Sequence, residues 1–93
     1  MRHSAETEAM FLKVLEETPQ NIQMKVDWSF DISTAIDSAL KRKGIGKKEL
    51  AQLTGTSPAA VSRWLGGNHN FTLSTLAKIS AVLGTPLISV ASK

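Results

Sequence analysis

The stretch from Lys47 to Gly67, KKELAQLTGTSPAAVSRWLGG, constrains the fold of this chain more than any other. Its apolar residues form two short groups at helical spacing, and residues 54–57, TGTS, lie between them. Gly55 is suited to close a helix, because glycine adopts positive φ without steric strain. Ser57 and Pro58 are suited to open the next one, since the hydroxyl accepts an orphan amide and proline lacks that amide. The stretch therefore predicts two helices joined by a tight turn.

The apolar residues on either side of the turn indicate how these two helices pack. The residues expected to face inward are Leu50, Ala51 and Leu53 in the first helix, and Val61, Trp64 and Leu65 in the second. Ala51 lies four residues before Gly55, and its small side chain allows the helices to cross closely. Two helices that meet across a glycine turn form a helix-turn-helix, whose second helix can enter the major groove of DNA.

The chain resembles the phage-repressor-like, or XRE, class of helix-turn-helix proteins. The resemblance runs from about Ile36 to Leu87, and it depends on Leu50, Ala51, Gly55, Val61, Trp64 and the closing glycine. It implies an all-α, lambda-repressor-like bundle. We expect the DNA-binding domain over residues 19–93, with the motif at 47–67, a helical extension over residues 1–18 and a short extended arm at the C-terminus.

A further helix and an apolar tail follow the motif. Phe71 and Thr72 suit the hydrophobic staple and the N-cap of a helix that ends at Gly84-Thr85-Pro86. The expected core stripe of this helix consists of Leu73, Leu76, Ala77, Ile79, Ser80 and Leu83. The tail, PLISVASK, is too apolar for a free terminus, so we expect a strand or arm that packs on the core or pairs with a second chain.

The first 43 residues contain one clear helix signal and one ambiguity. Residues 4–17 predict an amphipathic helix, whereas residues 22–30 alternate between apolar and polar side chains, which is typical of a strand. The same residues also fit one helix from Pro19 to about Lys43. Its polar face would carry Gln23, Asp27, Asp31, Thr34 and Ser38, and its apolar face Ile22, Val26, Phe30, Ile36 and Leu40. We favour the helix because Thr18-Pro19 is a start signal, although a strand satisfies the alternation equally well.

Composition narrows the class of protein. Ninety-three residues with 42% hydrophobic content suffice for one core, and the absence of cysteine excludes disulfides and thiolate metal sites. No apolar run reaches the roughly 20 residues of a membrane span, and the acidic residues near the N-terminus do not fit a signal peptide. We therefore expect a soluble cytoplasmic protein. No nucleophile–base pair, phosphate-binding glycine fingerprint or metal-ligand spacing indicates an enzyme or a cofactor.

Charge is divided unevenly along the chain. Residues 1–40 hold three basic and seven acidic residues, whereas residues 41–93 hold eight basic residues and one acidic residue. The basic part carries the helix-turn-helix, as expected of a module that binds a polyanion.

The resemblance implies which residues contact DNA. Base edges would be met from Pro58, Ala59 and Arg63, with Ser62 as a weaker candidate; Arg63 alone can bond guanine in bidentate fashion. Pro58 and Ala59 can pack only against a thymine methyl. Phosphate contacts are expected from Lys41, Arg42, Lys43, Lys47, Lys48, Ser57, Asn68, His69 and Asn70. For residues 41–43, capping of the negative helix end is an equally good interpretation. Lys47 stands where the family commonly has glutamine; lysine keeps the phosphate contact but lacks the bidentate amide geometry that braces the second helix.

Two functions follow from this resemblance. The first is an XRE-type repressor that binds an inverted repeat in double-stranded DNA as a homodimer. The second arises because small XRE proteins with a segment before the motif resemble HigA-like antitoxins, which repress their own operon and neutralise an mRNA-cleaving RelE/HigB-like toxin. The acidic residues 1–40 would then cover the toxin; alternatively, they extend the core or the dimer interface.

Overall fold

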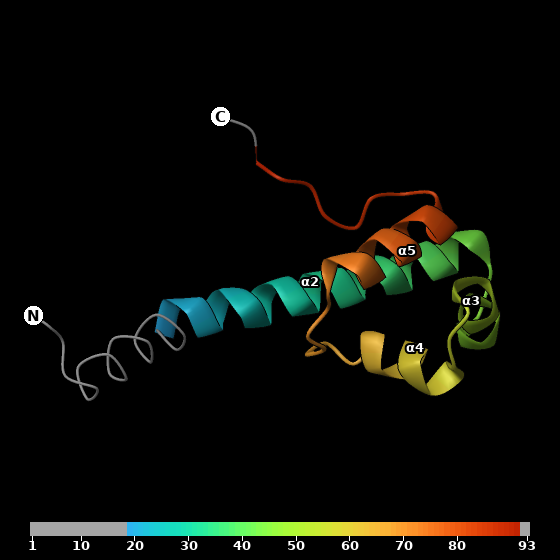
Figure 1. The fold of residues 1–93 in the computed structure, drawn as a ribbon, viewed down its shortest axis with the longest axis horizontal. Helices are drawn as coiled ribbons and strands as arrows, with labels where there is room; N and C mark the ends of the chain where they lie inside the picture. The colour runs from blue at the N-terminus through green and yellow to red at the C-terminus, as the bar shows by residue number, and fades with distance from the viewer. Residues whose placement is uncertain (1–18, 92–93) are drawn as a thin grey trace, which may run out of the picture.

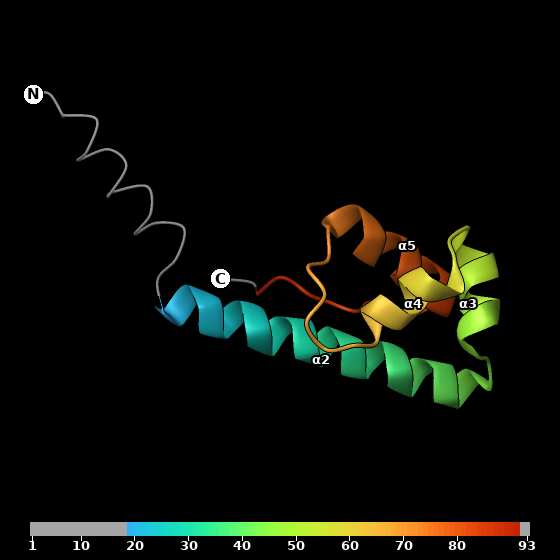
Figure 2. The same ribbon diagram turned by 90° about the horizontal axis from the view of Figure 1, so that it is seen from below.

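The computed structural model describes residues 19–91 of the 93-residue chain. This part contains four helices and no strand: α2 (Pro19–Lys43), α3 (Lys47–Thr54), α4 (Pro58–Trp64) and α5 (Leu73–Leu83). The three short helices lie against the second half of α2, and its first half extends beyond them (Figures 1 and 2). The prediction of an all-α bundle is confirmed. The helix expected over residues 4–17 lies outside the described residues, as does the predicted cap at Thr18.

Residues 22–30 are helical, so the strand alternative is wrong. Pro19 is the first residue of α2. An amide at this position has no partner within the helix, so proline loses no hydrogen bond there. Beyond the first turn, each amide of a helix bonds a carbonyl within the helix, whereas a strand here would need a neighbouring strand. The helix ends at Lys43; Gly44 follows it with φ +68°, and the Ile45 amide bonds the Leu40 carbonyl at 3.1 Å. Ile45 is half-buried against the core.

α2 contributes to the core only from Ser29 onward. Its buried apolar residues are Ile32, Ile36, Ala39 and Leu40. Ile22, Val26 and Phe30 belong to the predicted apolar face of this helix, but they are 45%, 50% and 60% exposed and lie outside the core. Within residues 19–91, the short helices lie against the second half of α2, and the first half projects past them and leaves these apolar side chains exposed (Figures 1 and 2).

The turn between α3 and α4 is closed by the predicted residues. Gly55 has φ +70°, and the Thr56 amide bonds the Ala51 carbonyl at 2.8 Å. Leu50 and Ala51 are buried as expected, but Leu53 is 54% exposed and Thr54 takes its place in the interior. Residues 50, 51 and 54 lie on one side of a 3.6-residue helix, and position 53 falls about 100° away from Thr54. The Thr54 hydroxyl is satisfied by donating to the Leu50 carbonyl at 2.8 Å.

α4 and α5 begin as predicted. The Ser57 hydroxyl accepts the Ala60 amide at 3.1 Å, and the Thr72 hydroxyl accepts the Thr75 amide at 3.2 Å. α4 ends at Trp64, and Leu65 is its C-cap.

The core face of α5 is narrower than expected, and the arm after it is only partly packed. Leu76, Ile79 and Leu83 are buried, whereas Leu73 is 73% exposed and Ala77 is also exposed, so their placement in the core stripe is wrong. Leu73 lies in the first turn, and Ala77 points more than 100° from the buried stripe. In the arm, Leu87 is half-buried and its amide donates to the Ser80 hydroxyl at 3.1 Å.

Candidate DNA-binding surface

The outer face of α4 carries all four predicted base-contacting residues. Pro58, Ala59, Ser62 and Arg63 are exposed, while the inner residues Val61 and Trp64 are 0% and 4% exposed. The burial of Trp64 fits its predicted role as a core residue. α4 packs against α3, so the reading face is presented by a helix that the core holds from behind. Contact of these residues with bases stays a prediction.

The basic residues lie together where α2 ends and α3 begins. Lys41, Arg42 and Lys43 form the last turn of α2, and Lys47 and Lys48 the first turn of α3. All five are exposed. The Lys41 ammonium lies 3.0 Å from the carboxylate of Asp37 one turn earlier. An exposed pair of this kind contributes little stability, so Lys41 remains free to exchange this partner for a phosphate.

The segment after α4 contains the predicted phosphate-binding loop, residues 66–70. Gly67 has φ +94°, a conformation that other residues rarely adopt, and Asn68 and Asn70 are exposed. His69 is half-buried, and its ring meets the edge of the Phe71 ring at a centroid distance of 4.7 Å. Within residues 19–91, no group of acidic and histidine side chains is arranged to hold a metal ion.

Ser33 of α2 lies directly behind this loop, and the sequence does not reveal it. Its hydroxyl donates to the Trp64 carbonyl at 2.5 Å and accepts the Gly67 amide at 3.2 Å. These partners are 31 and 34 residues away in the sequence, so neither helical periodicity nor a local motif connects them. The hydroxyl joins the end of α4 to the beginning of the loop.

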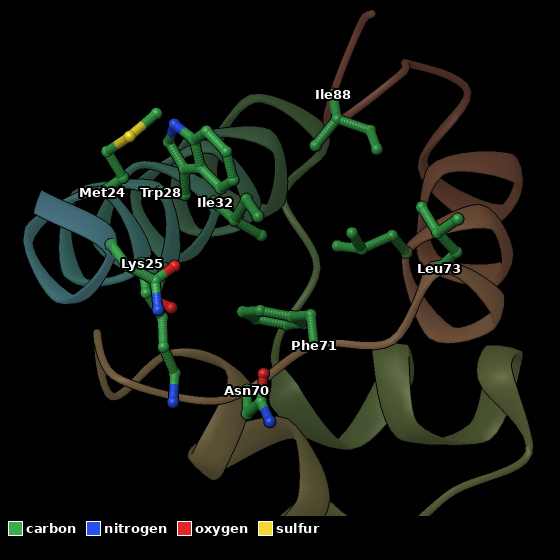
Figure 3. A pocket seen from close by; sticks show the side chains of 11 residues that line it. Met24, Lys25, Trp28, Ile32, Asn70, Phe71, Leu73 and Ile88 are labelled. Carbon is green, nitrogen blue, oxygen red and sulfur yellow. The ribbon is translucent and has the colours of Figure 1, made fainter. Parts of the chain in front are cut away.

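A groove opens between the first half of α2, the start of α5 and the C-terminal arm (Figure 3). Its volume is about 470 Å³. Most of its lining is apolar: Met24, Trp28, Ile32, Phe71, Leu73, Leu76 and Ile88. Lys25 extends along one edge beside the loop that carries Asn70 (Figure 3). Lys25 is therefore a further cation near the predicted phosphate-binding loop. The sequence does not indicate this, because Lys25 and the loop lie far apart in the chain.

The fold and this surface define a helix-turn-helix DNA-binding protein. Residues 35–87 match the Cro/C1-type HTH DNA-binding domain, which covers more than half of the chain. The chain belongs to this family, and the predicted XRE class is thereby confirmed; it is a DNA-binding transcription regulator. No curated protein and no solved structure gave a match. Among residues 19–91, no helix has the length and apolar character to span a bilayer.

Proposed function

We propose that the protein is a sequence-specific repressor that binds an inverted repeat as a dimer. The outward face of α4 carries this proposal, because it presents Arg63 between two sets of phosphate-binding candidates. One set lies at the α2–α3 corner, and the other is the loop 66–70. A single recognition helix reads only a few base pairs, so useful specificity requires two copies on half-sites one helical turn apart.

Phosphate contacts and base contacts would have different roles in this binding. Lys47 and the neighbouring cations would bind phosphates and set the position of the domain on the duplex without reading sequence. Arg63 would supply base discrimination through the O6 and N7 atoms of guanine, and Pro58 and Ala59 would add apolar contact with a thymine methyl. A dimer bound in this way represses by occupying the site that polymerase needs.

Selection from a random pool of duplexes tests this function. The wild-type protein should enrich a palindromic sequence with half-sites about 10 base pairs apart, and the mass of the complex should correspond to two chains per duplex. Its affinity should fall steeply with salt, because each neutralised phosphate releases counterions. Enrichment of no sequence, or an affinity indifferent to salt, would refute the proposal.

We also propose a second function, neutralisation of a basic RelE/HigB-like toxin. The groove in Figure 3 supports it, since its α2 residues precede the family domain and include Met24 at 42% and Trp28 at 60% exposure. Asp27 and Asp31 are exposed on α2, and Asp31 lines a hollow that adjoins the groove beside Trp28 and Ile88. An exposed apolar groove suits a protein partner better than it suits DNA, and the acidic residues of α2 would favour a basic one.

Co-expression with a toxin encoded next to this gene tests the second function. Trp28→Asp should abolish protection and toxin binding, whereas Leu53→Asp should retain both, because Leu53 is a similarly exposed apolar residue on α3 outside the groove. Equal protection by both variants would refute this use of the groove. If Trp28→Asp instead converts a dimer to a monomer, the groove binds a second copy of the chain and the toxin assignment fails.

A further inference from the structure

Ser33 makes two hydrogen bonds that meet at one oxygen atom. It is 4% exposed, and the sequence between its two partners is short: Trp64 is the last residue of α4, and Gly67 follows three residues later. A serine hydroxyl has one proton to donate and lone pairs to accept, so both bonds form at the same time. The Ser33 hydroxyl thus connects the Trp64 carbonyl to the Gly67 amide.

Both backbone groups need such a partner. The last carbonyls of a helix have no amide within the helix, and α4 has only seven residues. The Val61 and Arg63 carbonyls accept from Leu65 and Gly66, at 3.1 and 3.2 Å. The Trp64 carbonyl accepts from Ser33. The bond to the Trp64 carbonyl is buried and that from the half-buried Gly67 is partly so. A buried group that loses its partner costs its desolvation penalty, so the bond to Trp64 matters more than its net strength suggests.

The contact also fixes how closely the loop approaches α2. A Cβ atom placed on Gly67 would lie 3.6 Å from Cδ1 of Phe30, one turn before Ser33 on the same helix. The Phe30 ring lies beside the loop at Gly67, and the Ser33 hydroxyl holds the Gly67 amide. On either side of this contact lie Arg63, the predicted base reader, and residues 68–70, the predicted phosphate contacts.

We propose that Ser33 is a positioning residue for DNA binding, which sets the angle between the recognition helix and the phosphate-binding loop. This inference rests on the proposed repressor function. Ser33 and Phe30 lie before residue 35, where the match to the family domain begins. The helical segment preceding the family domain therefore acts on the DNA-binding surface from behind. The Ser33 hydroxyl couples base reading by α4 to phosphate binding by the loop. Loss of this hydroxyl should impair sequence discrimination more than general DNA affinity.

Hydrogen exchange tests whether Ser33 holds the junction. In Ser33→Ala, the Gly67 amide should exchange at least about tenfold faster than in the wild type, while Leu50 and Ile79 in the core retain their protection. Ser33→Thr keeps the hydroxyl and should restore slow exchange. Ser29→Ala is the matched control, because Ser29 is also buried on α2 but takes part in neither bond. Unchanged Gly67 exchange in Ser33→Ala would overturn the inference.

DNA binding tests whether the junction serves recognition. The probes are the duplex that the wild type enriches from a random pool and a scrambled duplex of equal length. At a temperature where every variant is folded, Ser33→Ala should bind the enriched duplex about tenfold more weakly and the scrambled one less than about twofold more weakly. Ser29→Ala should match the wild type on both, and Ser33→Thr should restore discrimination.

The outcomes separate this inference from the function on which it rests. A Ser33→Ala protein that discriminates like the wild type, with only a lower Tm, shows a structural role and overturns the inference. If the wild type itself enriches no duplex, the repressor function fails, and the DNA-binding role of Ser33 fails with it. Exchange at Gly67 still decides in that case whether the hydroxyl holds the loop.

Discussion

The two halves of α2 have similar apolar content and different surroundings. From Ser29 to Leu40, the side chains that face α3, α4 and α5 are buried, and Ile36 is fully enclosed. From residue 19 to 28, every residue is exposed, although Ile22, Met24, Val26 and Trp28 are as apolar as those farther along. One continuous helix therefore serves as part of a DNA-binding core at one end and as an open surface at the other.

The difference shows that an apolar pattern specifies a face and not a partner. The second half of α2 stabilises the bundle and supports the reading surface through Ser33. The first half lines the groove and precedes the family domain, so stability of the bundle gives no reason for its apolar residues. Exposed apolar surface of this kind supports the proposed partner site. Substitutions in the two halves should accordingly affect different properties.

The largest expected effect is on the free energy of unfolding, and it is tested by replacing one isoleucine with alanine in each half of α2. Ile36→Ala should lower the free energy of unfolding by about 2–5 kcal/mol, because Ile36 is fully buried and alanine leaves a cavity. Ile22→Ala should change it by less than about 0.5 kcal/mol, since Ile22 is 45% exposed at the projecting end. Denaturant unfolding measures both. Equal losses would show that the first half of α2 is covered in solution.

The next largest effect is on base preference, which should depend on α4 and not on the first half of α2. Arg63→Ala should weaken binding to the enriched duplex by about 1–3 kcal/mol and relax the preference at one base pair. Lys25→Ala, on the projecting half, should leave base preference unchanged and at most reduce the salt slope by about 1. Titrations on matched and singly mismatched duplexes measure this. An equal loss for Arg63→Ala on enriched and random DNA would contradict its assignment to the bases.

The features predictable from sequence are the ones that local chemistry decides. Gly55, Ser57 and Thr72 end or begin helices through their own φ or hydroxyl, and each does so where expected. The motif likewise determined which residues of α4 point outward. Local chemistry does not determine how far a neighbouring helix reaches, which is why Leu73 was expected in the core and is exposed, and why Ile22 is exposed on the predicted apolar face. Ser33 escaped prediction because its partners are distant in sequence.

The two tryptophans should report the same contrast spectroscopically. Trp64 is 4% exposed and Trp28 is 60% exposed, so acrylamide should quench Trp28 several times more efficiently. In Trp28→Phe, only Trp64 emits, and its emission should be blue-shifted and resistant to quencher while the Tm is nearly unchanged. Strong shielding of Trp28 in the wild type at micromolar concentration, lost on dilution, would instead reveal a second copy over the groove.

The smallest expected effect lies at the C-terminal end of α2, where the packed half meets the basic corner. Asp37→Asn removes the exposed pair with Lys41, and the free energy of unfolding should fall by less than about 0.5 kcal/mol. DNA affinity should rise a few-fold at low salt, because Lys41 is released for phosphate contact and a nearby negative charge disappears. Asp27→Asn is the control on the projecting half; Asp27 bonds Gln23 at 2.9 Å and lies far from the corner along the helix. If Asp37→Asn left DNA affinity unchanged at every salt concentration, the last turn of α2 would serve to cap the helix and would not contact DNA.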